Sequence, residues 1–264
     1  MSTPWPPERR WTGLAVDLGS ARTRVWALGG GLVLDVPTVT SPDAGPDTFH
    51  PFRRRAVDVA GTARMLDRLL RHAPPRLCRR PLVVLTAPVL DGVPCRAAAR
   101  AAVEVLRPRA VLTVPTARAV ALAAREDLSR PLLVVDAGAR FTETVLLIDG
   151  AVTDARRVAL GACGLDADPA AAARLADAVA AMVATVADGD RTAAEPSAAA
   201  RGVLLAGGGA LRPEFVRRLA RRLDVAVKVV PAPDTAAVRG AAELLGSARR
   251  HPSSTGGVPA PVPE

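Results

Sequence analysis

The sequence has very few aromatic side chains and almost no lysine. Aromatic residues make up 3% of its 264 residues, tyrosine is absent, and Lys228 is the only lysine among 35 basic residues. Nucleic-acid-binding chains commonly interleave basic and aromatic residues, whereas here the arginines behind the net charge of +9 are spread along the chain. We therefore expect no nucleic-acid partner. An anionic membrane surface remains an alternative use of the charge.

Long apolar runs and paired cysteines are also lacking. No stretch is long enough to span a bilayer, and residues 1–10 show proline and charge in place of the apolar core of a signal peptide. Cys78, Cys95 and Cys163 are odd in number and lack metal-ligand spacing, which predicts reduced thiols. These features predict a cytoplasmic globular protein, with disordered segments at 1–10 and 251–264.

The sequence does contain three apolar runs, each of which ends at a glycine turn. They occupy residues 13–20, 132–138 and 202–210, and in the first two Asp17 or Asp136 stands two residues before a glycine. Apolar runs bounded by glycine predict buried strands, and glycine lets the backbone approach a ligand closely. A carboxylate can hold a hydrated Mg²⁺ ion. The pattern therefore predicts a nucleotide held between two similar halves.

Strands and helices are expected to alternate in both halves. Strands are predicted at 14–17, 24–28, 32–35, 82–86, 111–114, 132–136, 142–148, 151–158, 203–206 and 225–230, and helices at 62–71, 96–106, 117–125, 170–187, 213–223 and 235–248. Each half opens with a hairpin that carries Asp-x-Gly. This weak repeat predicts a first lobe over 11–130, completed by the helix at 235–248, and a second lobe over 131–234.

These segments resemble the MreB family of bacterial actin homologues, within the actin, Hsp70 and sugar-kinase superfamily. The matching segments are 17–23 and 136–138 for the two phosphate motifs, 29–39 for a stretch typical of MreB, 205–211 for the adenosine motif and 238–241 for the closing helix. The resemblance extends over most of residues 13–246. It implies an α/β protein with the actin/Hsp70-like ATPase fold, built from two ribonuclease-H-like lobes.

The resemblance also implies a site for ATP or ADP with Mg²⁺. Asp17 and Asp136 would hold the metal through water. The turn after Asp17 would face the phosphates, and the glycines at 207–209 would approach the adenosine. The implied site residues are Asp17, Gly19, Ser20, Thr23, Asp136, Gly138, Gly207, Gly208 and Gly209.

Departures from the MreB pattern predict weak binding and no catalysis. The second phosphate motif continues with Ala139, Arg140 and Phe141, whose side chains narrow the space, although Arg140 offers a direct contact to a phosphate. Thr113-Val114 stands where the family has its catalytic glutamate, so no carboxylate orients the attacking water. Residues 39–53 and 158–170 are too short for the two small cap subdomains, which we expect to be reduced or missing.

The sequence therefore favours a shortened, degenerate MreB-like protein with a role in cell shape or cell-wall morphogenesis. It would act as a cytoskeletal partner or scaffold of a full-length MreB-type filament or of cell-envelope synthesis proteins. The alternative is a compact ATPase or small-molecule kinase of the same superfamily, although no substrate lid is visible. A chaperone-like or pilus-assembly adaptor ranks third, because no substrate-binding domain follows the lobes.

Contact with the inner face of the membrane is a further expectation. Trp5 and Trp11 flank two arginines, and Leu77 lies in a predicted loop at 76–80, where the MreB family has a membrane-contact loop. The acidic residues at 91, 104 and 143 have no evident partner in the sequence. We expect them to be solvated or to cap helices.

Overall fold

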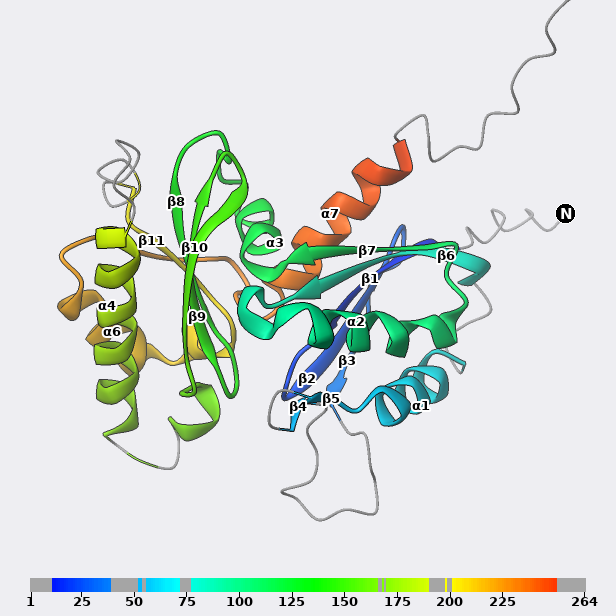
Figure 1. Ribbon diagram of the computed structural model, residues 1–264, viewed down its shortest axis with the longest axis horizontal. Coiled ribbons are helices and arrows are strands. Elements are labelled where there is room, and N and C mark those ends of the chain that lie inside the picture. Colours follow the sequence, from blue (N-terminus) through cyan, green and yellow to red (C-terminus); the bar gives the residue numbers. More distant parts are fainter. Residues whose placement is uncertain are drawn as a thin grey trace, which may run out of the picture.

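Two five-stranded sheets of the same design stand beside each other (Figure 1). The computed structural model describes residues 11–38, 52–53, 56–71, 77–165, 168, 170–189, 198 and 201–250. The first sheet has the order β3-β2-β1-β6-β7 and the second the order β10-β9-β8-β11-β12. In each, three antiparallel strands are followed by two parallel ones. The predicted internal repeat is thus present in the strand topology.

The strands of the first sheet are β1 (Trp11–Leu18), β2 (Arg22–Ala27), β3 (Gly31–Pro37), β6 (Leu77–Ala87) and β7 (Ala110–Pro115). Those of the second are β8 (Leu132–Ala137), β9 (Thr142–Ile148), β10 (Ala151–Val158), β11 (Val203–Ala206) and β12 (Val227–Val229). A short pair, β4 (Phe52–Arg53) and β5 (Ala56–Val57), lies between β3 and the first helix.

Helices cover the outer face of each sheet. α1 (Val59–Arg71) and α2 (Gly92–Val103) pack on the first sheet, where Leu66 and Val103 meet Val83 in one buried cluster. α4 (Ala171–Gly189) and α6 (Pro213–Arg222) pack on the second, where Phe215 and Leu175 are fully buried. The described residues also form the 3-10 turns η2 (Val89–Asp91), η3 (Glu104–Leu106), η4 (Ala162–Gly164) and η5 (Gly208–Leu211). We call each sheet with its outer helices a lobe.

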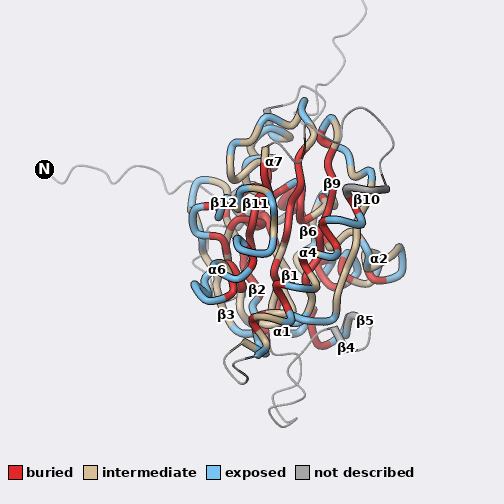
Figure 2. Tube along the Cα trace, turned by 90° about the vertical axis from the view of Figure 1, so that its left-hand side faces the viewer, coloured by how far each residue is buried: buried red, intermediate tan, exposed pale blue. Residues whose placement is uncertain are grey.

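Two helices lie between the lobes and join them. α3 (Thr116–Ala123) packs on the second sheet and α7 (Ala236–Arg250) on the first, and the inner strands beneath them are buried (Figures 1 and 2). The two helices cross at Gly240, where a β-carbon would stand 1.7 Å from the carbonyl oxygen of Ala119. Only glycine permits this approach, so the two helices, and with them the two lobes, pack in direct backbone contact at Gly240.

The α/β fold with two similar lobes is confirmed, but two local predictions are wrong. The predicted helix at 96–106 begins earlier, at Gly92, because Pro94 lies in the first turn, where its missing N–H has no helical partner to lose. The predicted loop at 76–80 is instead the start of β6 from Leu77, which pairs with Trp11 of β1. This pairing joins residues far apart in the sequence, so no local pattern reveals it.

The described residues leave little room for cap subdomains. Between β10 and α4 they form only η4, and between β3 and α1 only the β4–β5 pair. No described helix combines the length and the apolar character needed to cross a membrane. Trp5 and the segments expected to be disordered, 1–10 and 251–264, lie outside the described residues.

Candidate functional site: a cleft between the lobes

A cavity of about 220 Å³ lies between the lobes. Seven of the nine predicted site residues line it: Asp17, Gly19, Ser20, Asp136, Gly138, Gly207 and Gly208. The other two do not. Thr23 is fully buried with its hydroxyl 3.0 Å from that of Thr38, and Gly209 packs against Ala137, to which a β-carbon would come within 2.7 Å. Both residues therefore pack against the turns on the side away from the cavity.

The glycines of the cavity wall allow the strand-turns to close. A β-carbon on Gly19 would lie 2.6 Å from the carbonyl oxygen of Arg22, and one on Gly138 would lie 2.8 Å from that of Phe141. Gly207 has a φ of +84°, and its β-carbon would meet Ala137 and the Asp136 carboxylate at 2.4 and 2.6 Å. The third turn therefore packs directly on the second, as a shared ligand site requires.

Asp17 and Asp136 are the next-to-last residues of the central strands β1 and β8. Burial raises the pKa of Asp17, while a hydrogen bond from Thr86 at 2.7 Å and the charge of Arg24 oppose the rise. Burial also raises the pKa of Asp136, to about 7, and the neighbouring charges of Asp17 and Glu143 add to the rise. A divalent cation would relieve both carboxylates of this cost. The described residues form no cluster of three or more metal-ligating side chains, so such an ion would be held largely through water and a ligand.

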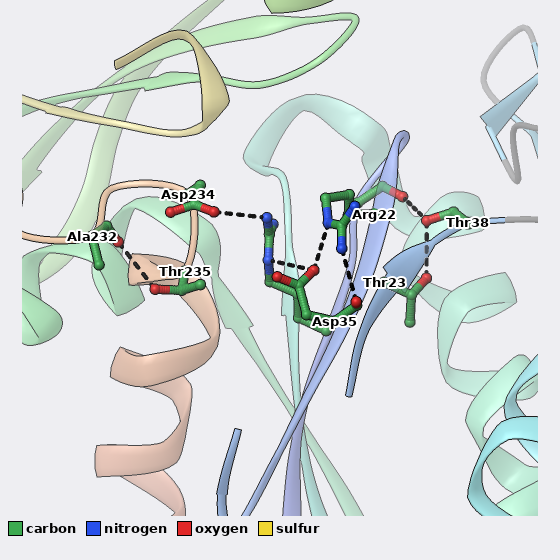
Figure 3. A network of polar contacts seen from close by, with 9 residues as sticks. Arg22, Thr23, Asp35, Thr38, Ala232, Asp234 and Thr235 are labelled. Carbon is green, nitrogen blue, oxygen red and sulfur yellow. Dashed lines mark hydrogen bonds and ion pairs between the residues drawn. The ribbon is translucent and has the colours of Figure 1, made fainter. Parts of the chain in front are cut away.

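Arginine and aspartate side chains surround the first carboxylate. Arg24 on β2 lies opposite Asp17, and its guanidinium lies 3.2 Å from Asp35 on β3 and 3.1 Å from Asp234 before α7. Arg22 also meets Asp35, at 2.6 Å (Figure 3). These pairs attach the first hairpin to the start of α7.

The hairpin of β9 and β10 contacts the first lobe through charged side chains. Glu143 on β9 is 6% exposed and lies opposite Arg157 on β10, at 2.6 Å. Arg157 also meets Asp91 of the first lobe at 2.5 Å. Burial alone would lower the pKa of Arg157, but the two carboxylates raise it above its ordinary value. The expectation that these carboxylates are solvated or cap helices is therefore wrong for Asp91. Glu143 does accept hydrogen bonds from the first N–H groups of η2, and Glu104 is exposed.

The cavity wall contains residues that sequence reasoning did not select. These are Arg22, Arg24, Thr86, Asp91, Cys95, Arg96, Thr116, Glu143, Arg157 and Asp234. Strand pairing could have identified two of them, because Arg24 lies directly opposite Asp17 and Glu143 lies directly opposite Asp136. Ala139 and Phe141 line the cavity, as their predicted narrowing effect requires, but Arg140 is exposed and lies outside the wall.

Neither a protein-family model nor a curated protein matches the sequence significantly. Solved structures do match. MreB5 of Spiroplasma citri bound to AMPPNP superposes with a TM-score of 0.78 at 13% identity, over 92% of this chain and 98% of that one. The MamK double helical filament gives 0.68 at 15% identity, over 88% and 98%. The ethanolamine utilization protein EutJ from Carboxydothermus hydrogenoformans gives 0.62 at 17%, over 92% of each.

The chain has the actin/Hsp70-like fold. The resemblance to MreB is thus confirmed for the fold, and at these identities the likeness extends no further. The cavity of this actin-like chain is smaller than the roughly 300–1,000 Å³ typical of pockets for small molecules. Its polar groups suit an anionic ligand with a divalent cation.

Proposed function

We propose that the chain is an MreB-like cytoskeletal protein with a weak site for ATP or ADP with Mg²⁺. The observation that carries this proposal is the meeting of Asp17 and Asp136, from equivalent strands of the two lobes, at one glycine-lined cavity. The structures of MreB5 bound to ADP and to AMPPNP support a nucleotide in such a fold.

In this proposal the two aspartates hold Mg²⁺ through water, and the ion neutralises the phosphates. Gly19, Ser20 and Gly138 contribute backbone that can approach the phosphates, and Gly207 and Gly208 contribute backbone near the adenosine. Hydrolysis is not expected. Thr113 and Val114 lie on β7 outside the cavity wall and carry no carboxylate to orient water.

The proposed role is that of a partner or scaffold in cell shape or cell-wall morphogenesis. The MamK filament shows that a similar fold assembles, so a full-length MreB-type filament is the first partner to consider. Cell-envelope synthesis proteins are the second. We infer a cytoplasmic location.

Calorimetric titration with Mg-ATP and Mg-ADP tests the nucleotide site. We expect Asp17→Ala to weaken any measured binding by about 10–100-fold, the range seen when groups that support a metal are removed. The matched control is Asp177→Ala, which removes an exposed carboxylate paired with Arg222 far from the cavity. Circular dichroism checks that both variants remain folded.

Equal affinity of Asp17→Ala and the unchanged protein would remove the site assignment. Undetectable binding of either nucleotide at millimolar concentration would show that the cleft has lost the site. Steady phosphate release that disappears in Asp136→Ala would favour the alternative, a compact ATPase or kinase.

A further inference from the structure

Arg157 holds groups of both lobes at once. Its guanidinium donates to Glu143 Oε1 of its own lobe through Nε at 3.0 Å and Nη2 at 2.6 Å. Its Nη1 lies 2.5 Å from Asp91 Oδ1 in the first lobe. The ring of Phe141 lies 5.3 Å from the guanidinium carbon, a distance typical of a cation–π contact. Contacts within its own lobe thus hold the Arg157 side chain in place, and its guanidinium contacts the first lobe.

Glu143 makes a second connection across the cleft. Its carboxylate accepts hydrogen bonds from the backbone N–H groups of Val89 at 3.0 Å and Leu90 at 3.1 Å, both in η2 of the first lobe. Hydrogen bonds to a charged group are shorter and stronger than neutral ones. Together with the Arg157–Asp91 pair, three charge-assisted contacts join the second hairpin to η2.

These contacts and the two joining helices border the same cavity. Thr116 and Val120 of α3 and Ala237 of α7 line it, as do Asp91, Glu143 and Arg157. Rotation at the Gly240 crossing would leave the Glu143–Arg157 pair intact, since both residues belong to one hairpin. It would break the contacts to Asp91, Val89 and Leu90, leaving buried donors and acceptors without partners.

We propose that Glu143, Arg157 and Asp91 form a latch that holds the cleft closed without a nucleotide. The closed arrangement of the lobes is then a property of the chain itself. A ligand can shift a conformational equilibrium only by its different affinity for the two states. Because the latch already favours the closed state, nucleotide changes the lobe arrangement little, and a partner that recognises closed lobes can bind the nucleotide-free protein.

Distance measurement between two spin labels tests the latch in the absence of nucleotide. Labels at Arg64→Cys on α1 and Ala184→Cys on α4 occupy exposed positions, one in each lobe, after the native cysteines are replaced. Arg157→Met keeps the apolar length of the side chain and removes its charge. The control is Arg156→Met, because Arg156 pairs with Asp154 on its own strand and makes no described contact across the cleft.

We expect one narrow distance population in the unchanged protein and in Arg156→Met. In Arg157→Met we expect a second, longer population. Asp91→Ala keeps the Glu143–Arg157 pair and removes the acceptor for Arg157 in the first lobe. It should therefore show the longer population too, and it tests the latch if Arg157→Met does not fold. A single narrow population in a folded Arg157→Met or Asp91→Ala would overturn the proposal, as would a broad distribution in the unchanged protein. None of these outcomes depends on whether nucleotide binds.

Discussion

The central strands of the two sheets end in equivalent rows of side chains that carry different charges. In the first sheet the row across β1, β2 and β3 reads Asp17, Arg24, Asp35. In the second, the row across β8, β9 and β10 reads Asp136, Glu143, Arg157. The first aspartate therefore has a cation as its neighbour, whereas the second has another carboxylate.

The parallel neighbour of each central strand adds to this difference. β6 brings Thr86 to Asp17, and its hydroxyl donates a hydrogen bond to the carboxylate. β11 brings Ala206 to the equivalent place beside Asp136, where no hydroxyl is available. Burial raises the pKa of both carboxylates, but the neighbours of Asp17 oppose the rise, whereas those of Asp136 add to it. Strand topology fixes where these groups lie, and the individual residues decide their charge.

The largest expected effect comes from removing the charge of Asp136. Its pKa of about 7 in the folded protein lies above its ordinary value of 3.8. The folded state therefore holds its proton more tightly, and stability falls as pH rises from about 4 to about 7. A shift of this size corresponds to about 4 kcal/mol. Without divalent cations, we expect Asp136→Asn to equal the unchanged protein near pH 4 and to exceed it above pH 7.

Denaturant unfolding across this pH range measures the difference. A constant difference between variant and unchanged protein at every pH would show that Asp136 titrates at its ordinary pKa, and the contrast between the two rows would then fail. Addition of Mg²⁺ above pH 7 should stabilise the unchanged protein and not Asp136→Asn, because the ion requires the carboxylate.

Thr86→Val tests the support of the first carboxylate and should have the next largest effect. The substitution keeps the shape of the side chain and removes the donor to Asp17. A hydrogen bond to a charged group contributes about 1.5–3 kcal/mol, and the pKa of Asp17 should rise further. Thr142→Val is the control, because its hydroxyl donates to the neutral carbonyl of Leu160 at 2.9 Å. A similar loss of unfolding free energy in both would mean that the charge of Asp17 does not matter.

Most of the fold could be predicted because its signals are local. Apolar runs, glycine turns and Asp149-Gly150 between β9 and β10 determine where strands begin and end. The paired aspartates could be predicted for the same reason, since each follows a buried strand directly. Partners brought together by strand pairing could not be identified from these local signals.

The Glu143–Arg157 pair shows why. The hairpin starts with Ile148 opposite Ala151, and continuing in that register would place Arg156 opposite Glu143. An irregularity between Val152 and Asp154 shifts the register by one residue, so that Arg157 takes the place instead. Two adjacent arginines look equivalent in the sequence, and a single extra residue in one strand decides which of them reaches the cleft.

Ala206→Ser is the smallest change and would make the second row resemble the first. The added hydroxyl would stand beside Asp136 as Thr86 stands beside Asp17, and a donor to the carboxylate favours its charged form. We therefore expect the pKa of Asp136 to fall from about 7. The cost of burying a hydroxyl and the gain from the new hydrogen bond oppose each other, so unfolding free energy should change by only about 1 kcal/mol. Carboxyl NMR titration measures the pKa directly. An unchanged value in the folded variant would mean that the carboxylate beside Asp136, and not the missing hydroxyl, accounts for the difference between the rows.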